Sequence, residues 1–292
     1  MGKGDLLERG LNMTKILKVI VGIIVVVVLA VQVISLISSY QFNQTVAQEV
    51  SVFFQNVKNN HVIVTEADLA GLPDLVQAWL KKAQVLGKEK IVSVRSEQDI
   101  KLRLAKDKPW MPAQAVQYYR TEEPGLIWKA NIKAAPFFHI AGRDKYLDGQ
   151  GNMLIKLMSV FTVADGRGPE IDQGSLLRYL AEIMWFPTAA LNEYLKWEPI
   201  DATSAKVTMD YKGVSASGIL TFNEQGEIIR FEAERYGEFD GEYRLETWLA
   251  EVADYKEFNG FVIPSTGKIT WKLDTGDFEW YHFVVKEMEY NQ

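Results

Sequence analysis

The stretch KITWKL (268–273) carries the pattern from which the fold can be predicted. Ile, Trp and Leu occupy alternate positions, and Lys, Thr and Lys fill the positions between them. The segments KVTMDY (206–211) and IRFEAE (229–234) repeat this period of two. Successive side chains of a strand point to opposite faces, so the pattern is typical of antiparallel strands with one buried and one solvated face.

Short turn signals separate these apolar runs. A pair of residues ending in glycine favours a tight hairpin, because glycine adopts positive φ without a steric penalty. Hairpins join strands that are neighbours in a sheet, so we expect a meander rather than parallel crossovers. The signals are Asp148-Gly149, Lys212-Gly213, Gln225-Gly226, Asp240-Gly241 and Thr275-Gly276.

Three segments depart from the alternation. The apolar spacing from Leu72 to about Leu86 predicts a helix. A second helix is predicted over Asp172–Trp185, with Asp172 as its N-terminal cap and Pro187 beyond its end. Met153–Val163 (MLIKLMSVFTV) is apolar at nearly every position, which predicts one strand that is covered on both faces.

The N-terminal region contains a run typical of a membrane-spanning helix. From Val19 to Ile37 only Gly22, Gln32 and Ser35 interrupt the apolar residues. A helix of this length, at about 1.5 Å per residue, matches the ~30 Å hydrocarbon core of a bilayer. We therefore expect a transmembrane helix over residues 19–38, and retention of this helix is favoured over cleavage as a signal peptide.

Flanking charge predicts the orientation of this helix. Lys3, Arg9, Lys15 and Lys18 precede it, and the next basic residue is Lys58. Basic residues mark the cytoplasmic side of a span, so residues 1–18 are predicted to be cytoplasmic. An amphipathic stalk over residues 39–60 and an extracytoplasmic β-rich domain over residues 61–292 would follow. The predicted location is a bacterial cytoplasmic membrane, crossed once.

The predicted fold class is thus α+β. A transmembrane helix precedes a large curved antiparallel β-sheet, a half-barrel-like meander, with a few helices packed on its concave face. No internal repeat or low-complexity segment is evident in the sequence.

Composition narrows the function classes. Beyond residue 40 the chain has 28 basic and 36 acidic residues, a net charge of −8, which argues against a nucleic-acid partner. The chain has no cysteine, so disulfides, thiolate metal sites and cysteine nucleophiles are excluded. Its three histidines are scattered, and it contains no phosphate-binding loop or dinucleotide motif. We expect neither a metal nor a cofactor.

Three segments resemble the signature blocks of an uncharacterised bacterial family with a domain of unknown function. They are GRDKYLDGQGNMLIKL (142–157), LLRYLAEIMWFPTAAL (176–191) and GEIIRFEAER (226–235). The resemblance covers roughly residues 72–289 and implies a membrane-anchored protein, but it carries over no catalytic residue. The expected architecture is also similar to half-barrel carriers that move lipids or lipoproteins across bacterial envelopes, although a shared fold does not establish a shared function.

The predicted helix over Asp172–Trp185 supplies the first candidate site. Arg178 and Glu182 are four residues apart, and Trp185 falls on roughly the same face. On a solvated helix such a pair contributes only a few tenths of a kcal/mol. An aromatic side chain on that face is unusual in water, which favours the alternative that the face looks into a cavity and orients a ligand.

Four further residues are candidates. Arg143 and Asp144 precede the glycine-rich turn of 148–151. The spacing of Asp144, Asp148 and Asn152 also invites a calcium interpretation, because oxygen ligands at short intervals suit Ca²⁺, although the ligand pattern of a calcium loop is incomplete. A tight turn explains the glycines equally well. Arg230 and Arg235 lie on or next to a strand whose outward face also carries Glu232 and Glu234, so cross-strand charge pairing competes with a binding role.

Three functions follow from these observations. The first is a membrane-tethered module that binds an apolar or amphipathic, lipid-like ligand in the concavity of the sheet without catalysis. The second is a cell-envelope hydrolase that uses carboxylates in the same cavity. The third is a structural protein that docks a partner in the envelope. The cavity lining distinguishes the first two, and an exposed apolar patch favours the third.

Overall fold

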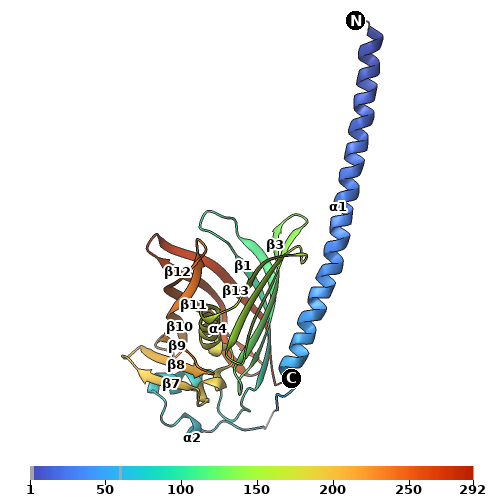
Figure 1. Ribbon diagram of the computed structural model, residues 1–292. Coiled ribbons are helices and arrows are strands. Elements are labelled where there is room, and N and C mark those ends of the chain that lie inside the picture. The colour runs from blue at the N-terminus through green and yellow to red at the C-terminus, as the bar shows by residue number, and fades with distance from the viewer. Residues whose placement is uncertain (1–2, 59–60, 292) are drawn as a thin grey trace.

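The computed structural model describes residues 3–58 and 61–291, and it confirms the predicted fold class. A 13-stranded antiparallel sheet curves into a half-barrel (Figure 1). Its strand order is β6-β5-β4-β3-β2-β1-β13-β12-β11-β10-β9-β8-β7, so the meander is interrupted only where β1 pairs with β13.

The strands form two wings. The N-terminal wing comprises β1 to β6, and the C-terminal wing comprises β7 to β13. The first wing contains β1 (Ser93–Leu102), β2 (Met111–Arg120), β3 (Gly125–Ala135), β4 (Phe138–Leu147), β5 (Gln150–Leu157) and β6 (Phe161–Gly166). The second contains β7 (Leu195–Pro199), β8 (Ser204–Tyr211), β9 (Val214–Phe222), β10 (Ile228–Phe239), β11 (Glu242–Phe258), β12 (Phe261–Leu273) and β13 (Gly276–Tyr290).

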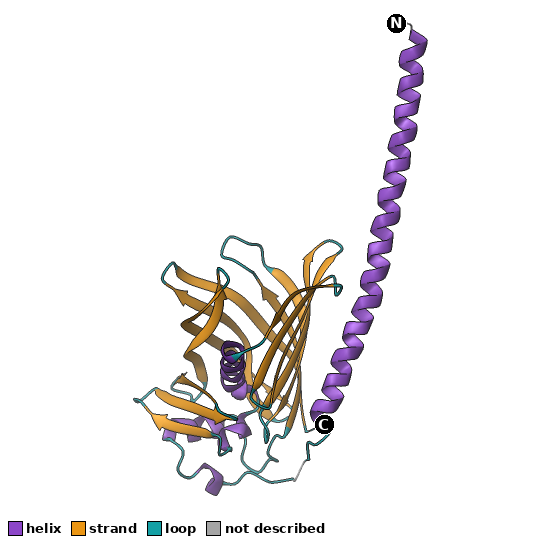
Figure 2. Ribbon diagram, in the orientation of Figure 1, coloured by secondary structure: helices purple, strands orange, loops and turns teal. Residues whose placement is uncertain are grey.

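The connection between the two edge strands crosses the inside of the half-barrel. From β6 the chain enters helix α4 (Pro169–Glu182), continues through two short 3-10 helices, η1 (Ile183–Trp185) and η2 (Pro187–Leu191), and reaches β7. Figure 2 shows α4 enclosed by the curved sheet. Two shorter helices, α2 (Glu66–Leu69) and α3 (Asp74–Lys82), lie at the base of the molecule.

The outer, convex face carries the long helix α1 (Lys3–Phe54), which runs beside the N-terminal wing (Figure 1). Val46 and Phe53 are buried there against Ile127 of β3. This part of α1 packs on the domain, and the helix ends at Phe54. Residues 59 and 60 of the predicted stalk lie outside the described residues. The apolar stretch of α1 is long enough to cross a membrane, and nearly all its side chains are exposed.

The predicted glycine turns are all found, and their backbone geometry explains the residues used. Asp148 and Gly149 both have positive φ (52° and 83°) between β4 and β5. Lys212 and Gly213 (51° and 83°) join β8 to β9 in the same way. Two successive positive φ values match the right-handed twist of the flanking strands. The short hairpins therefore fix the order of the strands along the sheet.

The prediction of one covered strand over Met153–Val163 is wrong. The segment is two strands, β5 and β6, joined by a turn in which Met158 and Ser159 have positive φ (55° and 59°). Neither residue signals a turn in the sequence, because non-glycine residues seldom adopt this conformation. Phe161 and Val163 of β6 are exposed, so the segment is not covered on both faces either.

Both predicted helices differ from the observed ones in their bounds. Helix α3 is shorter than the predicted Leu72–Leu86, and α4 begins at Pro169, before Asp172. Asp172 does not cap α4. Its carboxylate instead accepts a hydrogen bond of 2.6 Å from the backbone N–H of Gly151 in β5. The predicted cap thus ties α4 to the N-terminal wing.

Candidate functional site

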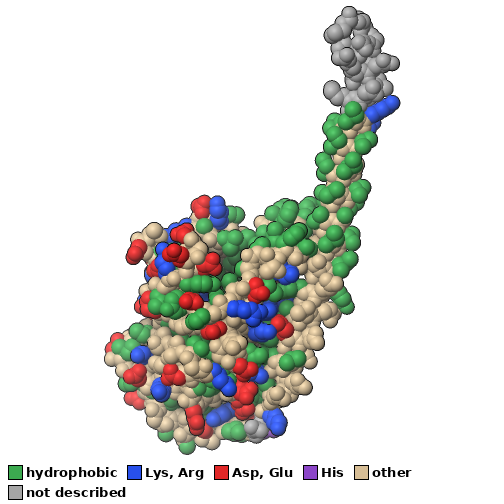
Figure 3. All heavy atoms as spheres, in the orientation of Figure 1, with side chains coloured by type: hydrophobic (Ala, Val, Ile, Leu, Met, Phe, Trp, Pro, Cys, Tyr) green, Lys and Arg blue, Asp and Glu red, His purple; other side chains and the backbone are tan. Residues whose placement is uncertain are grey.

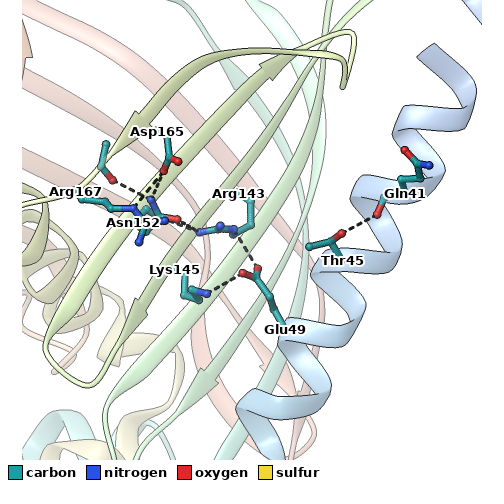
Figure 4. A network of polar contacts seen from close by, with 9 residues as sticks. Gln41, Thr45, Glu49, Arg143, Lys145, Asn152, Asp165 and Arg167 are labelled. Atoms are coloured by element: carbon teal, nitrogen blue, oxygen red, sulfur yellow. Dashed lines mark hydrogen bonds and ion pairs between the residues drawn. The ribbon is translucent and has the colours of Figure 1, made fainter. Parts of the chain in front are cut away.

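Arg143 and Asp144 are neighbours in β4, and strand geometry places their side chains on opposite faces of the sheet. The Arg143 guanidinium lies on the convex face, 3.1 Å from the carboxylate of Glu49 in α1. Lys145 shares this face and binds the other oxygen of Glu49 at 2.7 Å. Figure 4 shows the three side chains meeting between α1 and the sheet. Arg143 therefore holds α1 in place and is remote from the concave face.

The calcium interpretation of the 144–152 segment does not fit this geometry. Asn152 accepts a hydrogen bond of 2.6 Å from Arg143 and donates one of 2.6 Å to Asp165 (Figure 4). Asp144 points to the other side of the sheet. The oxygen atoms expected to share one cation are thus separated by the strand itself, and the glycines serve the turn.

On the concave face, Asp144 meets the helix that crosses the half-barrel. Its carboxylate lies 2.7 Å from Nη1 of Arg178 in α4. The Nε of Arg178 lies 3.0 Å from Glu182, one helical turn along. The guanidinium also stacks over the ring of Trp128, 5.2 Å from its centroid. Burial acts to lower the pKa of Arg178, but Glu182 and Asp144 raise it above its ordinary value. Arg178 is therefore a permanent cation, neutralised on both sides.

The second oxygen of Glu182 is also occupied. It accepts hydrogen bonds of 2.7 Å from Gln117 and 3.1 Å from the hydroxyl of Tyr119, both on β2. Burial, together with the charge of Glu182, raises the pKa of Tyr119 well above its usual range. Tyr119 thus remains a neutral donor. Because both oxygens of Glu182 have partners, the carboxylate is held in place rather than free to take a proton from a substrate.

Trp185 does not share the face of Arg178 and Glu182, contrary to the helical projection. Helix α4 ends at Glu182, and the tighter 3-10 turn that follows rotates Trp185 into the core. Its indole donates a hydrogen bond of 3.1 Å to the backbone oxygen of Pro264 and packs edge-on against Phe283. Its geometry is that of a core residue.

Arg230 lies on the convex face of β10, where it is exposed. Its guanidinium is 3.9 Å from Glu251 on the neighbouring strand. A shallow depression of about 620 Å³ lies on the same outer face and includes Glu251 and Lys268. Lys268 is 3.2 Å from Glu251 and 3.3 Å from Glu279. These charges neutralise one another in solvent, which is the cross-strand pairing expected of a solvated sheet face.

Five residues further along β10, Arg235 is on the concave face. It stacks over the rings of Trp248 and Trp271, at 5.2 Å and 5.9 Å from their centroids. Its Nε donates a hydrogen bond of 3.1 Å to the backbone oxygen of Gly174 in α4. Burial and the nearby charge of Arg178 lower the pKa of Arg235 to about 10. Among the described residues, no carboxylate lies within 4.0 Å of this guanidinium.

Aromatic rings line the concave face around Arg235. Two glycines allow these rings to lie against the sheet. A Cβ at Gly237 would lie 2.5 Å from Phe239 and 3.1 Å from Trp271, and one at Gly142 would lie 3.1 Å from Trp128. The indole N–H of Trp248 is buried and has no hydrogen-bond partner among the described residues. The space-filling view shows the molecule hollowed between its two wings, with apolar side chains in the hollow (Figure 3).

Gln117 and Tyr119 were not among the candidates predicted from the sequence, and Arg235 was expected, with Arg230, beside the outward face of its strand. A signal existed for Arg235, because it continues the inward-facing series of Phe231 and Ala233 at a period of two. Gln117 and Tyr119 had none, since only the pairing of β2 beneath α4 brings them to Glu182.

The chain belongs to DUF6544, a family of unknown function whose model matches residues 62–283. A search of the curated proteins gives no match. Among solved structures, it is similar to a LolA superfamily protein from Nitrosomonas europaea, with 13% identity over 74% of this chain and 94% of that one, and a TM-score of 0.43. It is also similar to an outer-membrane lipoprotein-sorting protein domain from Vibrio parahaemolyticus, with 10% identity, 75% and 92% coverage and a TM-score of 0.44.

Proposed function

We propose that this DUF6544 protein is a membrane-tethered module that holds an amphipathic ligand on the concave face of its half-barrel, with the anionic head of the ligand on Arg235. The observation that carries the proposal is a half-buried guanidinium that stacks on two tryptophans and has no carboxylate within ion-pair distance among the described residues.

A buried charge is costly unless it is paired and hydrogen-bonded. Arg178, near the centre of α4, meets this condition with two carboxylates. Arg235 has one backbone acceptor and two ring faces, which leave N–H donors available in a planar fork. A phosphate or carboxylate head could accept from this fork in charge-assisted hydrogen bonds.

The apolar part of such a ligand would lie along the aromatic lining. From Arg235 the strand β10 runs to Phe239 at its tip, and Trp271 packs edge-on against Phe239 with ring centroids 5.4 Å apart. Binding sites for small amphiphiles combine an apolar wall with a few placed polar groups. The arrangement therefore suits a molecule with one acidic end and a hydrocarbon chain.

The apolar stretch of α1 would supply the tether. Residues 19–38 would cross the membrane, with residues 1–18 in the cytoplasm and the domain of residues 61–292 outside, as the flanking lysines and arginines favour. A bacterial cytoplasmic membrane, which is rich in amphiphiles with anionic heads, is the location that fits this proposal.

Native mass spectrometry of the full chain released from detergent micelles tests the ligand. The wild type is expected to carry an adduct with the mass of an anionic lipid. Arg235→Met should weaken ligand binding about tenfold and so lower the bound fraction, the effect of losing about 1.4 kcal/mol of charge-assisted hydrogen bonding. The matched control is Arg230→Met, on the other face of the same strand, which should retain the adduct. An adduct that is absent from the wild type, or equal in both variants, would overturn the proposal.

The hydrolase alternative finds less support in this geometry. Glu182 has partners on both oxygens, and Asp144 is held by Arg178, so the two carboxylates nearest the ligand stabilise a cation instead of activating water.

A further inference from the structure

Two hairpin tips at one end of the N-terminal wing expose large apolar side chains. We call them the rim hairpins: the β3–β4 tip, with Phe137 and Phe138, and the β5–β6 tip, with Phe161 just beyond its turn and Val163 two residues later in β6. These four side chains are 77%, 53%, 65% and 62% exposed, respectively. Exposed apolar residues gathered at one end of a molecule mark a contact surface.

The rim hairpins are fixed to α1. Ser35 donates a hydrogen bond of 2.9 Å to the backbone oxygen of Met158, and Gln32 donates one of 3.4 Å to that of Phe137. Ser39 lies 3.0 Å from the hydroxyl of Ser159 in the same turn. These bonds satisfy carbonyl groups at the two tips that the sheet itself leaves without partners.

Gln32 and Ser35 are two of the three residues that interrupt the apolar run of Val19–Ile37. The rim hairpins therefore lie beside the last part of that run, and α1 continues for about 8 Å beyond Gln32 before the run ends. Further contacts along α1 to Phe53 keep the helix on the sheet. If the apolar run lies in lipid, the two hairpin tips lie at the depth of the leaflet that surrounds the last part of the run.

We infer that the rim hairpins are immersed in the membrane leaflet on the domain side, next to α1. This inference rests on the proposed membrane span. It explains why a transmembrane run contains Gln32 and Ser35 at the positions that face the tips, since backbone carbonyls in lipid require partners. It also explains why Phe137, Phe138 and Phe161 point away from the protein.

The immersed rim would place the open end of the half-barrel on the bilayer. The tip of β10, which leads from Arg235 to Phe239, lies at the same end of the sheet (Figure 1). An amphiphile could then move from the leaflet to the aromatic lining without its hydrocarbon chain crossing water. Crossing water would expose the apolar surface of that chain.

Site-specific fluorescence tests this inference, because a chain without cysteine accepts one label at a chosen position. Phe161→Cys and Phe138→Cys report on the two rim hairpins. Glu224→Cys, exposed in the turn before β10 at the opposite end of the sheet, is the control outside lipid. Val26→Cys, within the apolar run, is the control inside lipid. Each full-length variant is labelled with an environment-sensitive dye and reconstituted in phosphatidylethanolamine–phosphatidylglycerol vesicles.

The rim labels are expected to show blue-shifted emission and to lose quenching by aqueous iodide. They should be quenched by lipids that carry a spin label on the acyl chain close to the headgroup. Glu224→Cys should show the reverse. If the label at Val26→Cys is in lipid but both rim labels are quenched by iodide as strongly as that at Glu224→Cys, the immersion is overturned and the span survives. If the label at Val26→Cys is itself in water, the membrane span of the proposed function fails.

Discussion

The two faces of the half-barrel are each covered by a helix, and they use charge differently. On the convex face, α1 presents Glu49 to Arg143 and Lys145, and two cations share one carboxylate. On the concave face, α4 presents Arg178 to two carboxylates. A second cation on that face, Arg235, has no such partner among the described residues.

The difference indicates which contacts are structural. Charged side chains that are paired with other side chains of the protein hold the helices on the sheet. Removing one partner leaves a buried charge unpaired. A ligand of opposite charge would add the most favourable interaction at a charged side chain that has no charged partner. The following variants test this contrast, beginning with the largest expected effect on stability.

Arg178→Met should destabilise the protein most, by about 3–5 kcal/mol, because it leaves Asp144 and Glu182 facing each other without a cation. The measurement is the free energy of unfolding from denaturant titration of the full chain. Arg230→Met, exposed on the convex face, should change it by less than about 0.5 kcal/mol. A loss at Arg178 no larger than that of the control would show that the concave cluster does not hold α4.

Glu49→Ala should cost about 2–3 kcal/mol, since the guanidinium of Arg143, whose side chain is only 8% exposed, loses its charged partner. The loss should be local. Hydrogen exchange is expected to accelerate in α1 between Phe42 and Phe54 more than in the C-terminal wing. Gln48→Ala, an exposed neighbour, serves as the matched control and should leave exchange unchanged.

Gly237→Ala should cost about 1–2 kcal/mol, because the added methyl would displace the rings of Phe239 and Trp271 from the sheet. The displaced rings would narrow the concave face, so the ligand adduct in native mass spectrometry should also decrease. Unchanged stability and an unchanged adduct would mean that the rings do not define the site.

Arg235→Met should have the smallest effect on stability, between no change and a slight gain, because the variant removes a half-buried cation that has no ion pair. Loss of ligand without loss of stability separates a binding role from a structural one. A destabilisation comparable with that of Arg178→Met would assign Arg235 to the fold instead.

The local features of the fold could be predicted from the sequence, because they depend on neighbouring residues. Alternation in the KITWKL and KVTMDY segments gives strands, and glycine after Asp148 or Lys212 gives tight turns. The turn at Met158 and Ser159 could not be predicted. Its two positive φ values are stabilised by hydrogen bonds from α1, more than 100 residues earlier in the chain.

The site was predictable only in part, for the same reason. Arg178 and Glu182 follow from helical spacing, and their approach to Asp144 follows only from the packing of α4 on β4. Trp185 was misplaced because the change from an α-helix to a 3-10 helix has no distinct sequence signal. Strict use of the two-residue period would have placed Arg143 and Asp144 on opposite faces of the sheet. It would also have placed Arg235, and not Arg230, on the concave face.

Helix α1 also sets the distance over which the protein could act. It is one continuous helix of 52 residues, and it is packed on the sheet from the rim hairpins to Phe53. If the apolar stretch of α1 spans a membrane as proposed, a domain held in this way has no flexible tether and would not travel between two membranes. Its reach would be its own height, roughly 40 Å for the 13 residues of β12. Under the same proposal, a ligand taken up at the bilayer would have to be collected by a partner that comes to the domain.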